Sequence, residues 1–287
     1  MPTVQAVHVD RFLSNMSLMY RNPLAVGLNM LPTVDVVNES DKYPIYDKSN
    51  LRVEPAMRAV GAESREIDYD ITSDSYVAAA RALKKLMPDR VTRNQDNPLS
   101  QERDTTIYLT DKLELIREVE TADLLTNSAT YSASHTLTLS GTSQWNDYDN
   151  SDPNQDVEYI REQIQADSLK MMNSALIPWQ VWLKLKYHPA LLGRLSTAST
   201  RILTVPMLAD LWELENIWIA ASMKNTGIPG GTDTLSRVWG KHVVFGYVEA
   251  NPTLQSASLG KTFRTVRQVK RWREEPREGL AMSPMAA

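Results

Sequence analysis

The chain has 287 residues, of which 42% are hydrophobic and 23% charged, and its formal net charge is −4. This size suits one large domain or two coupled ones, and the charge excludes a protein held to nucleic acid by its overall electrostatic field. The absence of cysteine excludes disulfides and thiolate metal sites, and no apolar run approaches the about 20 residues that span a bilayer.

Residues 1–37 contain short apolar clusters interrupted by Pro23 and Pro32, without a sustained helix or strand period. This pattern predicts an extended arm with room for one short helical turn. An arm this apolar needs a surface to lie on. On sequence alone, its own domain and another molecule are equally good candidates for that surface.

Residues 38–72 are rich in charge, and Ile67, Tyr69 and Ile71 alternate with polar residues in the second half. We expect a long two-stranded ribbon with almost no apolar residues on its second face. Because an isolated hairpin is marginal in water, the ribbon should be stabilised from outside its own domain. Its charges fit a rim of intermolecular ion pairs, with a solvated loop as the alternative. The candidate contact residues are Lys42, Lys48, Arg52, Glu54, Arg58, Glu63 and Arg65.

Residues 104–127, DTTIYLTDKLELIREVETADLLTN, form the stretch around which we expect the chain to be organised. No Gly or Pro interrupts it, Asp104 or Thr105 can cap its start, and Asn127 can end it. A helix of about 22 residues is roughly 33 Å long. A helical projection predicts a solvent-facing polar stripe of Thr110, Glu114, Arg117, Glu118 and Thr121. The residues expected to pack are Tyr108, Leu109, Leu115, Ile116, Val119 and Ala122.

The remaining segments alternate irregularly between helix and strand patterns, which favours an α+β fold over repeated βαβ units. Ser75–Leu86 is undecided between strand and short helix. After the long helix we expect a weak strand at Tyr131–Leu139 and a loop at 141–152. Three helices should follow: one starting at Asp152-Pro153, one from Pro178 to His188 and a short one at Thr204–Trp212. The rest should contain a buried strand at Asn216–Ala221, a Gly-rich loop at Thr226–Thr232, a strand near Trp239–Val248, a strand or short helix at Gly260–Trp272, and a tail.

The motif search favours no catalytic, cofactor or metal site. The histidines, His8, His135, His188 and His242, have no helical i, i+4 pairing. The Gly227–Thr232 loop lacks the glycine spacings that bind phosphate. The acids of 147–156 lack the Gly and Glu of a calcium loop and suit capping and turns. The tryptophans fit core and interface anchors better than a stacking platform for bases. A hydrolytic enzyme is therefore the rival class, without residues to carry it.

The order of segments resembles the major capsid protein of tailed double-stranded-DNA bacteriophages, whose fold is shared with encapsulins and the herpesvirus capsid floor. The resemblance covers nearly the whole chain and rests on packing and turn motifs that are persuasive only as a set. These motifs are the helix end with Arg117, Glu118, Ala122, Leu124 and Leu125, the loop Ser143–Asp147, the segment Leu185–Pro189 and the strand start Val238–Val243.

The resemblance implies a division of the chain into functional regions. These are an N-terminal arm at 1–37, an extended loop at 38–72 that lies over a neighbouring subunit, a peripheral domain at 73–156 with its spine helix at 104–127, an axial domain at 157–257, and a return strand of the peripheral domain with a C-terminal tail at 258–287.

The same resemblance implies a structural protein that self-assembles as pentamers and hexamers into an icosahedral shell around double-stranded DNA, which it binds without sequence specificity. Expected partners are a separate scaffolding protein, because the arm begins almost at Met1, a portal and decoration proteins. The shell would form in the bacterial cytoplasm and reside in the virion, without a membrane or cofactor. The alternative is an encapsulin-like compartment with an enzyme cargo. Some relatives form a Lys–Asn isopeptide bond in the extended loop, but for Lys42 and Lys48 we favour ordinary solvated or ion-paired roles.

Overall fold

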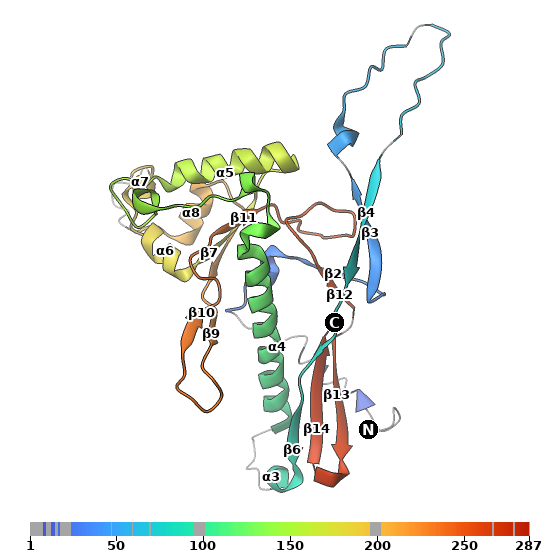
Figure 1. The fold of residues 1–287 in the computed structure, drawn as a ribbon, viewed down its shortest axis with the longest axis vertical. Coiled ribbons are helices and arrows are strands. Elements are labelled where there is room, and N and C mark those ends of the chain that lie inside the picture. The colour runs from blue at the N-terminus through green and yellow to red at the C-terminus, as the bar shows by residue number, and fades with distance from the viewer. Residues whose placement is uncertain are drawn as a thin grey trace.

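The structure is a computed structural model that describes residues 8–9, 13–14, 17, 24–46, 48–58, 60–68, 70–93, 101–195, 202–265, 267–277 and 279–286. Figure 1 shows one long helix, α4, at the centre of the molecule. A body of helices and short strands lies at the upper end of α4, a sheet of long strands lies beside its lower half, and the ribbon β3–β4 projects away from both. The mixture of helix and strand is the α+β architecture expected from the sequence.

Helix α4 spans Gln101–Thr126, so the predicted long helix is confirmed, with a start three residues earlier than expected. Asp104 consequently lies in the first turn, where its charge favours the helix dipole, and is not the cap. The helix ends as predicted before Asn127, whose side chain accepts a hydrogen bond from the amide of Ala129 at 3.0 Å. That bond begins a short 3₁₀ turn, η3, at Ser128–Thr130.

The polar stripe of α4 is buried, so the expectation that it faces solvent is wrong. Thr110, Glu118 and Thr121 are 0%, 2% and 7% exposed, whereas Tyr108 is 52% exposed. A helical projection assigns polar residues to water because a buried polar group needs a partner. In this protein the partners come from distant parts of the chain, and the hydroxyl of Ser17 lies 2.9 Å from that of Thr110.

Glu118 joins several segments at the upper part of α4. Its Oε2 accepts the amide hydrogen of Gly27 at 2.8 Å. Its Oε1 accepts from the indole of Trp239 at 2.6 Å, from the hydroxyl of Ser222 at 3.2 Å and from the amide of Val26 at 3.2 Å. A carboxylate can accept all four bonds, so the buried group is well satisfied.

The N-terminal segment packs on its own chain where it is described. Helix α2, Gly27–Met30, places Met30 in a buried cluster with Ala122 and Leu125 of α4. Strand β2, Thr33–Asp35, pairs in parallel with β12, Thr262–Arg264. Of the two surfaces left open for this arm, residues 26–36 therefore use their own domain. Most of residues 1–23 lie outside the described part of the chain.

The body above α4 is built on the sheet β11-β7-β8, with β7 at Ser174–Pro178, β8 at Asn216–Ala220 and β11 at Val244–Gly246. Every residue of β7 is buried, because β8 and β11 flank it and helices cover it. The helices are α5, α6, α7 and α8, at Pro153–Ser168, Trp179–Leu185, Pro189–Leu192 and Val205–Leu211. The predicted helices in this region are confirmed, including the start of α5, where Asp152 accepts from the amide of Asn154 at 3.0 Å.

The sheet beside the lower half of α4 has the order β1-β13-β14-β5, and β6 also pairs with β14. Its central strands β13, Arg267–Glu274, and β14, Gly279–Ala286, are antiparallel neighbours. The segment after 272, predicted as a tail, is thus largely strand β14, which packs Met282 against Leu13. The shorter strands are β1 at His8–Val9, β5 at Arg81–Ala82 and β6 at Lys85–Pro88, followed by helix α3 at Asp89–Arg93.

One further sequence-based expectation needs correction, and one undecided segment is resolved. Tyr131–Leu139 forms no strand, and its only regular element is the 3₁₀ turn η4 at Ala133–His135. Ser75–Leu86, which was undecided between strand and short helix, contains no helix: it holds the end of β4, the short strand β5 and the start of β6, separated by residues 78–80 and 83–84. The Gly-rich loop lies at the tip of a hairpin between β9, Met223–Asn225, and β10, Leu235–Arg237.

Candidate functional site

The ribbon is the most prominent projection of the molecule (Figure 1). Strands β3, Ser40–Tyr46, and β4, Ile71–Val77, pair antiparallel along their whole length. At the base, the ring of Tyr76 stacks on Phe263 with centroids 4.3 Å apart, and Tyr43 lies 5.5 Å from the same ring. Because Phe263 belongs to β12, this aromatic cluster fixes the ribbon to the rest of the molecule.

The projecting loop, residues 48–70, continues beyond the paired strands. It begins with the 3₁₀ turn η2, Lys48–Leu51. The side chain of Asn50 then ties the two arms together, because its amide nitrogen donates to the carbonyl of Asp70 and its oxygen accepts the amide hydrogen of Asp70, both at 2.9 Å. Among the described residues 52–58 and 60–68, no strand pairing follows. The predicted two-stranded ribbon is therefore confirmed for β3 and β4, but not for the arms beyond Asn50.

Three apolar side chains of the projecting loop are almost completely exposed. The exposed fractions are 94% for Val53, 102% for Met57 and 108% for Val60. Burying an aliphatic side chain of this size is worth about 1.5–3 kcal/mol, so the loop leaves a substantial gain unrealised within the chain. Sequence reasoning missed these residues because it concentrated on the charges. The signal was available, since they are isolated apolar residues in a segment with no core of its own.

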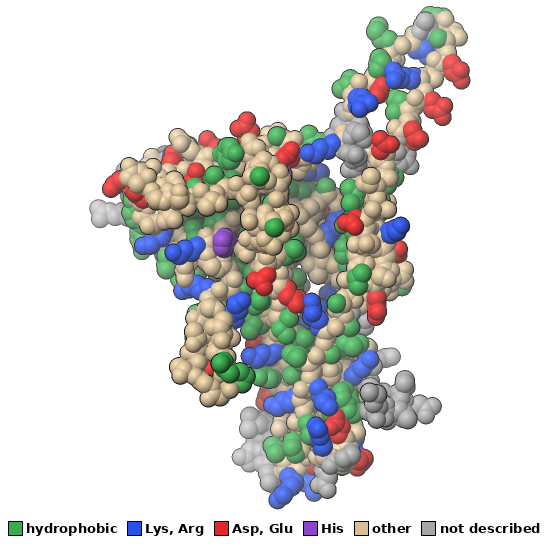
Figure 2. Space-filling model, in the orientation of Figure 1, with side chains coloured by type: hydrophobic (Ala, Val, Ile, Leu, Met, Phe, Trp, Pro, Cys, Tyr) green, Lys and Arg blue, Asp and Glu red, His purple; other side chains and the backbone are tan. Residues whose placement is uncertain are grey.

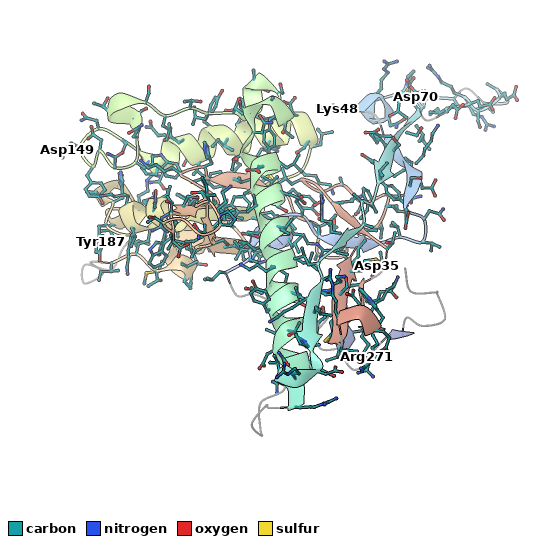
Figure 3. All side chains as sticks on the ribbon, turned by 60° about the horizontal axis from the view of Figure 1, so that its bottom comes forward. Asp35, Lys48, Asp70, Asp149, Tyr187 and Arg271 are labelled. Carbon is teal, nitrogen blue, oxygen red and sulfur yellow. The ribbon has the colours of Figure 1, made fainter. Side chains whose placement is uncertain are left out.

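Two of the predicted contact residues form an ion pair with each other. The guanidinium of Arg65 lies 2.9 Å from the carboxylate of Glu54 on the opposite arm. Lys48 lies 3.4 Å from Asp167 of α5, and Figure 3 shows Lys48 and Asp70 together at the base of the projecting loop. Exposed pairs of this kind contribute about 0–1 kcal/mol, so they orient the loop more than they stabilise it.

The other predicted contact residues are exposed along the ribbon and loop. Arg58 donates to the hydroxyl of Ser64 at 3.1 Å. Lys42, Arg52 and Glu63 take part in none of the ion pairs found among the described residues. Figure 2 shows basic side chains gathered on one arm of the projecting loop and acidic ones on the other. The loop therefore has two edges of opposite charge. Contact of the seven residues with another subunit stays a prediction.

The structure brings Ser151 and His188 together in the body, but not as a nucleophile and its base. Nδ1 of His188 accepts the amide hydrogen of Ala190 at 3.3 Å, so the proton of the neutral ring is on Nε2. Nε2 lies 3.0 Å from the hydroxyl of Ser151 and donates to it. The serine hydroxyl in turn donates to the carbonyl of Asp147. With its ring lone pair already used, His188 cannot accept the serine proton.

His188 is fully buried, and this burial lowers its pKa, which the nearby carboxylate of Asp152 opposes. The buried neutral ring is a structural feature that caps α7.

The described part of the chain contains no cluster of three or more metal-ligating side chains that could hold a metal ion. Over the same residues, no helix combines the length and apolar character needed to cross a bilayer.

Two viral proteins are similar to this chain in sequence. The major capsid protein of Burkholderia phage BcepMu is 28% identical over 241 residues, which cover 84% of this chain and 76% of the relative. The major capsid protein of Pseudomonas phage JBD67 is 28% identical over 246 residues, covering 83% and 77%. No protein-family model matches the chain.

Among solved structures, a phage-related protein from Bordetella bronchiseptica RB50 has a similar fold. The two structures superpose with a TM-score of 0.79 at 26% sequence identity, over 98% of this chain and 92% of that one. The superposition includes nearly the whole of both chains, so the arrangement of body, long helix and ribbon is shared and is not a local likeness.

Proposed function

We propose that this chain assembles as pentamers and hexamers into an icosahedral shell around double-stranded DNA. The premise is that the chain is a structural protein of a phage capsid shell and has the tailed-phage capsid fold. The projecting loop is the element that makes the contacts between subunits. The observation that carries this proposal is the near-complete exposure of Val53, Met57 and Val60 on a loop whose described residues 52–58 and 60–68 form no strand pairing.

A single subunit gains little stability from such a loop. Where the structure describes its arms, they form no ladder of backbone hydrogen bonds, and three of its apolar side chains are in water. Both deficits are removed when the loop lies on a neighbouring subunit, where apolar contact supplies affinity and the charged edges set orientation. Each contact is modest, and a closed shell repeats it in every subunit.

The regions keep the boundaries expected from the resemblance. Residues 38–72 act as the extended loop, 73–156 with the spine helix as the peripheral domain, and 157–257 as the axial domain, with 1–37 as the arm and 258–287 as the return strand and tail. Support comes from the three-part arrangement in Figure 1, in which the body, the long helix with its sheet, and the ribbon are spatially distinct. A separate scaffolding protein, a portal and decoration proteins complete the proposed set of partners, and assembly takes place in the host cytoplasm.

The test is assembly of the purified chain, followed by negative-stain electron microscopy and a sizing column. We expect shells, tubes or rings from the wild-type protein. The double variant Met57→Ser, Val60→Ser should remain a folded subunit, because both side chains are exposed, and should assemble at least tenfold less. Ala62→Ser is the matched control on the same loop and should assemble normally. A wild-type chain that stays monomeric even with its scaffolding protein would contradict the proposal.

The contents of native particles distinguish a capsid from an encapsulin-like compartment. Nuclease-protected DNA of genome length identifies a capsid, whereas a docked cargo enzyme identifies a compartment. The two curated relatives favour the capsid, because both are phage major capsid proteins. A hydrolytic role has no support from Ser151 and His188, whose hydrogen bonds leave no general base.

A further inference from the structure

Helix α6 carries an apolar stripe that the described part of the chain leaves about half exposed. Trp179, Leu183 and Tyr187 are 40%, 42% and 49% exposed. A spacing of four residues places Trp179 and Leu183 on one side of α6, and Tyr187 follows in the turn after the helix ends at Leu185. Trp182 and Leu185, on the opposite side, are buried in the core of the body. A surface helix usually needs only one apolar side, so the second side of α6 indicates a contact with another molecule.

The stripe has a basic surround. Residues 179–188 include Lys184 and Lys186 and no acidic residue. The ammonium of Lys186 lies 6.0 Å from the ring centre of Tyr187. Tyr148 borders the same surface, since its hydroxyl donates to the carbonyl of Lys184 at 3.1 Å. Figure 3 shows Tyr187 at the end of the molecule opposite to the projecting loop. The α6 stripe and the projecting loop therefore serve different contacts.

Helix α5 presents the complementary surface on the other side of the same body. Its sequence contains one basic residue, Arg161, which is paired with Glu213 at 2.9 Å. Glu158, Tyr159 and Glu162 are exposed, and 47% of Tyr159 is accessible to solvent. Figure 2 shows acidic side chains along the edge of the body formed by α5 and basic ones below, around α6. Of the acidic residues of the helix, Asp156 accepts a hydrogen bond from the indole of Trp145 and Asp167 pairs with Lys48. The charges that this face presents are therefore Glu162 and Glu158, the latter 3.8 Å from Arg194.

We infer that the α6 stripe of one subunit docks on the acidic α5 face of a second copy of this chain. This inference rests on the proposed function and adds a contact that the projecting loop does not make. Because the two faces differ, the contact is head-to-tail, and its repetition closes a ring when the rotation from one copy to the next is a whole fraction of a turn. The apolar side chains provide the buried surface, and the lysines facing the carboxylates select the orientation and exclude pairing of like faces.

The charges can be reversed without disturbing the fold, because Lys184 and Glu162 are both exposed. Lys184→Glu brings like negative charges together at the contact with Glu162, and Glu162→Lys brings like positive charges together with Lys184. We expect each single variant to form at least fivefold less ring and shell material than the wild type, by sizing column and electron microscopy. The double variant Lys184→Glu, Glu162→Lys restores opposite charges and should recover assembly to within twofold of the wild type. Lys241→Glu, another exposed lysine, is the charge control and should not change assembly.

Mixing the two single variants provides an independent check. In a head-to-tail ring that alternates them, every junction again joins opposite charges, so the mixture should form six-membered rings that neither variant forms alone. A five-membered ring cannot alternate and should stay rare. The inference is overturned if the single variants assemble as the wild type does, or if neither the double variant nor the mixture recovers. When the wild type assembles normally in that experiment, the proposed function survives. A wild type that never assembles overturns both.

Discussion

The indole Nε1 of Trp239 donates a 2.6 Å hydrogen bond to Oε1 of Glu118, across 121 positions of sequence. This bond joins the turn before β11 to the central helix, in a place where both side chains are almost wholly buried. A buried carboxylate with several donors is costly to alter, because each donor that loses its partner remains without water. The junction around Glu118 should therefore dominate the stability of the subunit.

Replacing Glu118 by Gln tests that role. The amide group of Gln would bring an N–H donor against the amide of Gly27 or the indole of Trp239, which are donors themselves. We expect a loss of about 2–4 kcal/mol in the free energy of unfolding, measured by urea denaturation of the unassembled subunit. Glu120→Gln, which removes only the exposed pair with Arg81, should cost less than about 1 kcal/mol. Equal effects of the two changes would contradict this account.

Gly27→Ala tests the packing of the N-terminal segment on α4. A Cβ at Gly27 would lie 2.9 Å from Oε2 of Glu118, 2.9 Å from Cγ2 of Thr121 and 3.0 Å from Cζ2 of Trp239. Helix α2 would have to shift, at about 1–3 kcal/mol. The readout is the midpoint of urea unfolding. Asn29→Ala, an exposed site on the same short helix, should change the midpoint little, and a silent Gly27→Ala would show that α2 is not held closely.

His188 should make stability depend on pH in the mildly acidic range. Burial lowers the pKa of the folded histidine below its ordinary value of 6.5, so the unfolded chain binds the proton more readily. The stabilising effect is complete above about pH 6.5 and is lost as the pH falls through the folded pKa. Thermal unfolding of wild type and His188→Asn at several pH values measures it. The melting temperature of the variant should fall less between pH 7 and 5 than that of the wild type, and parallel curves would refute the prediction.

Charge reversal at Arg52 or Arg65 should damage assembly and leave the subunit folded. Both residues are exposed on the projecting loop, and Arg65 also pairs with Glu54. Arg65→Glu therefore removes an internal pair as well as a proposed external one, and we expect it to be the more harmful change. Circular dichroism checks the fold and electron microscopy counts closed shells. Normal shells from both variants would show that the charges of this loop do not make contacts between subunits.

A boiled denaturing gel of assembled particles tests for covalent joining. Lys48 lies 3.4 Å from Asp167 of its own chain, which fits an ordinary ion pair. We expect one band at the subunit mass of 32.4 kDa. A ladder of higher bands would indicate an isopeptide bond made from Lys42 or Lys48.

Local signals predicted the elements that depend on short-range chemistry. The uninterrupted run before Asn127 gave the long helix, and Asp152 followed by Pro153 gave the start of α5, because capping and proline act within a few residues. The charged segment gave the ribbon only in part, because Ile71 begins β4 whereas Ile67 lies in an unpaired arm. The resemblance to the capsid fold, which rested on a set of packing and turn motifs, is borne out by two phage major capsid proteins of similar sequence.

Features that depend on residues far away in the sequence could not be predicted from such local patterns. Thr110 and Glu118 follow the pattern of a solvent-facing polar stripe. Their burial is possible because the segments that contain Ser17 and Trp239 supply hydrogen-bond partners. Strand β14 looked like a tail because its small residues and Pro284 weaken any strand pattern, although β13 and β6 pair with it on either side. Met57 and Val60 were overlooked because the charges of the loop drew the interpretation, although isolated apolar residues in a segment without a core of its own were a usable signal.

The hydrogen-bonded pair of Asn50 and Asp70 divides the projection into two mechanical parts. Below it, the paired strands and the rings at Phe263 form a stem with a fixed direction. Above it, no ladder bonds dictate a curvature among the described residues. A subunit that has to meet neighbours at slightly different angles can then keep one stem and let the tip follow each surface. Under this division, geometric tolerance in the shell resides in about twenty residues, and the core of the subunit need not deform.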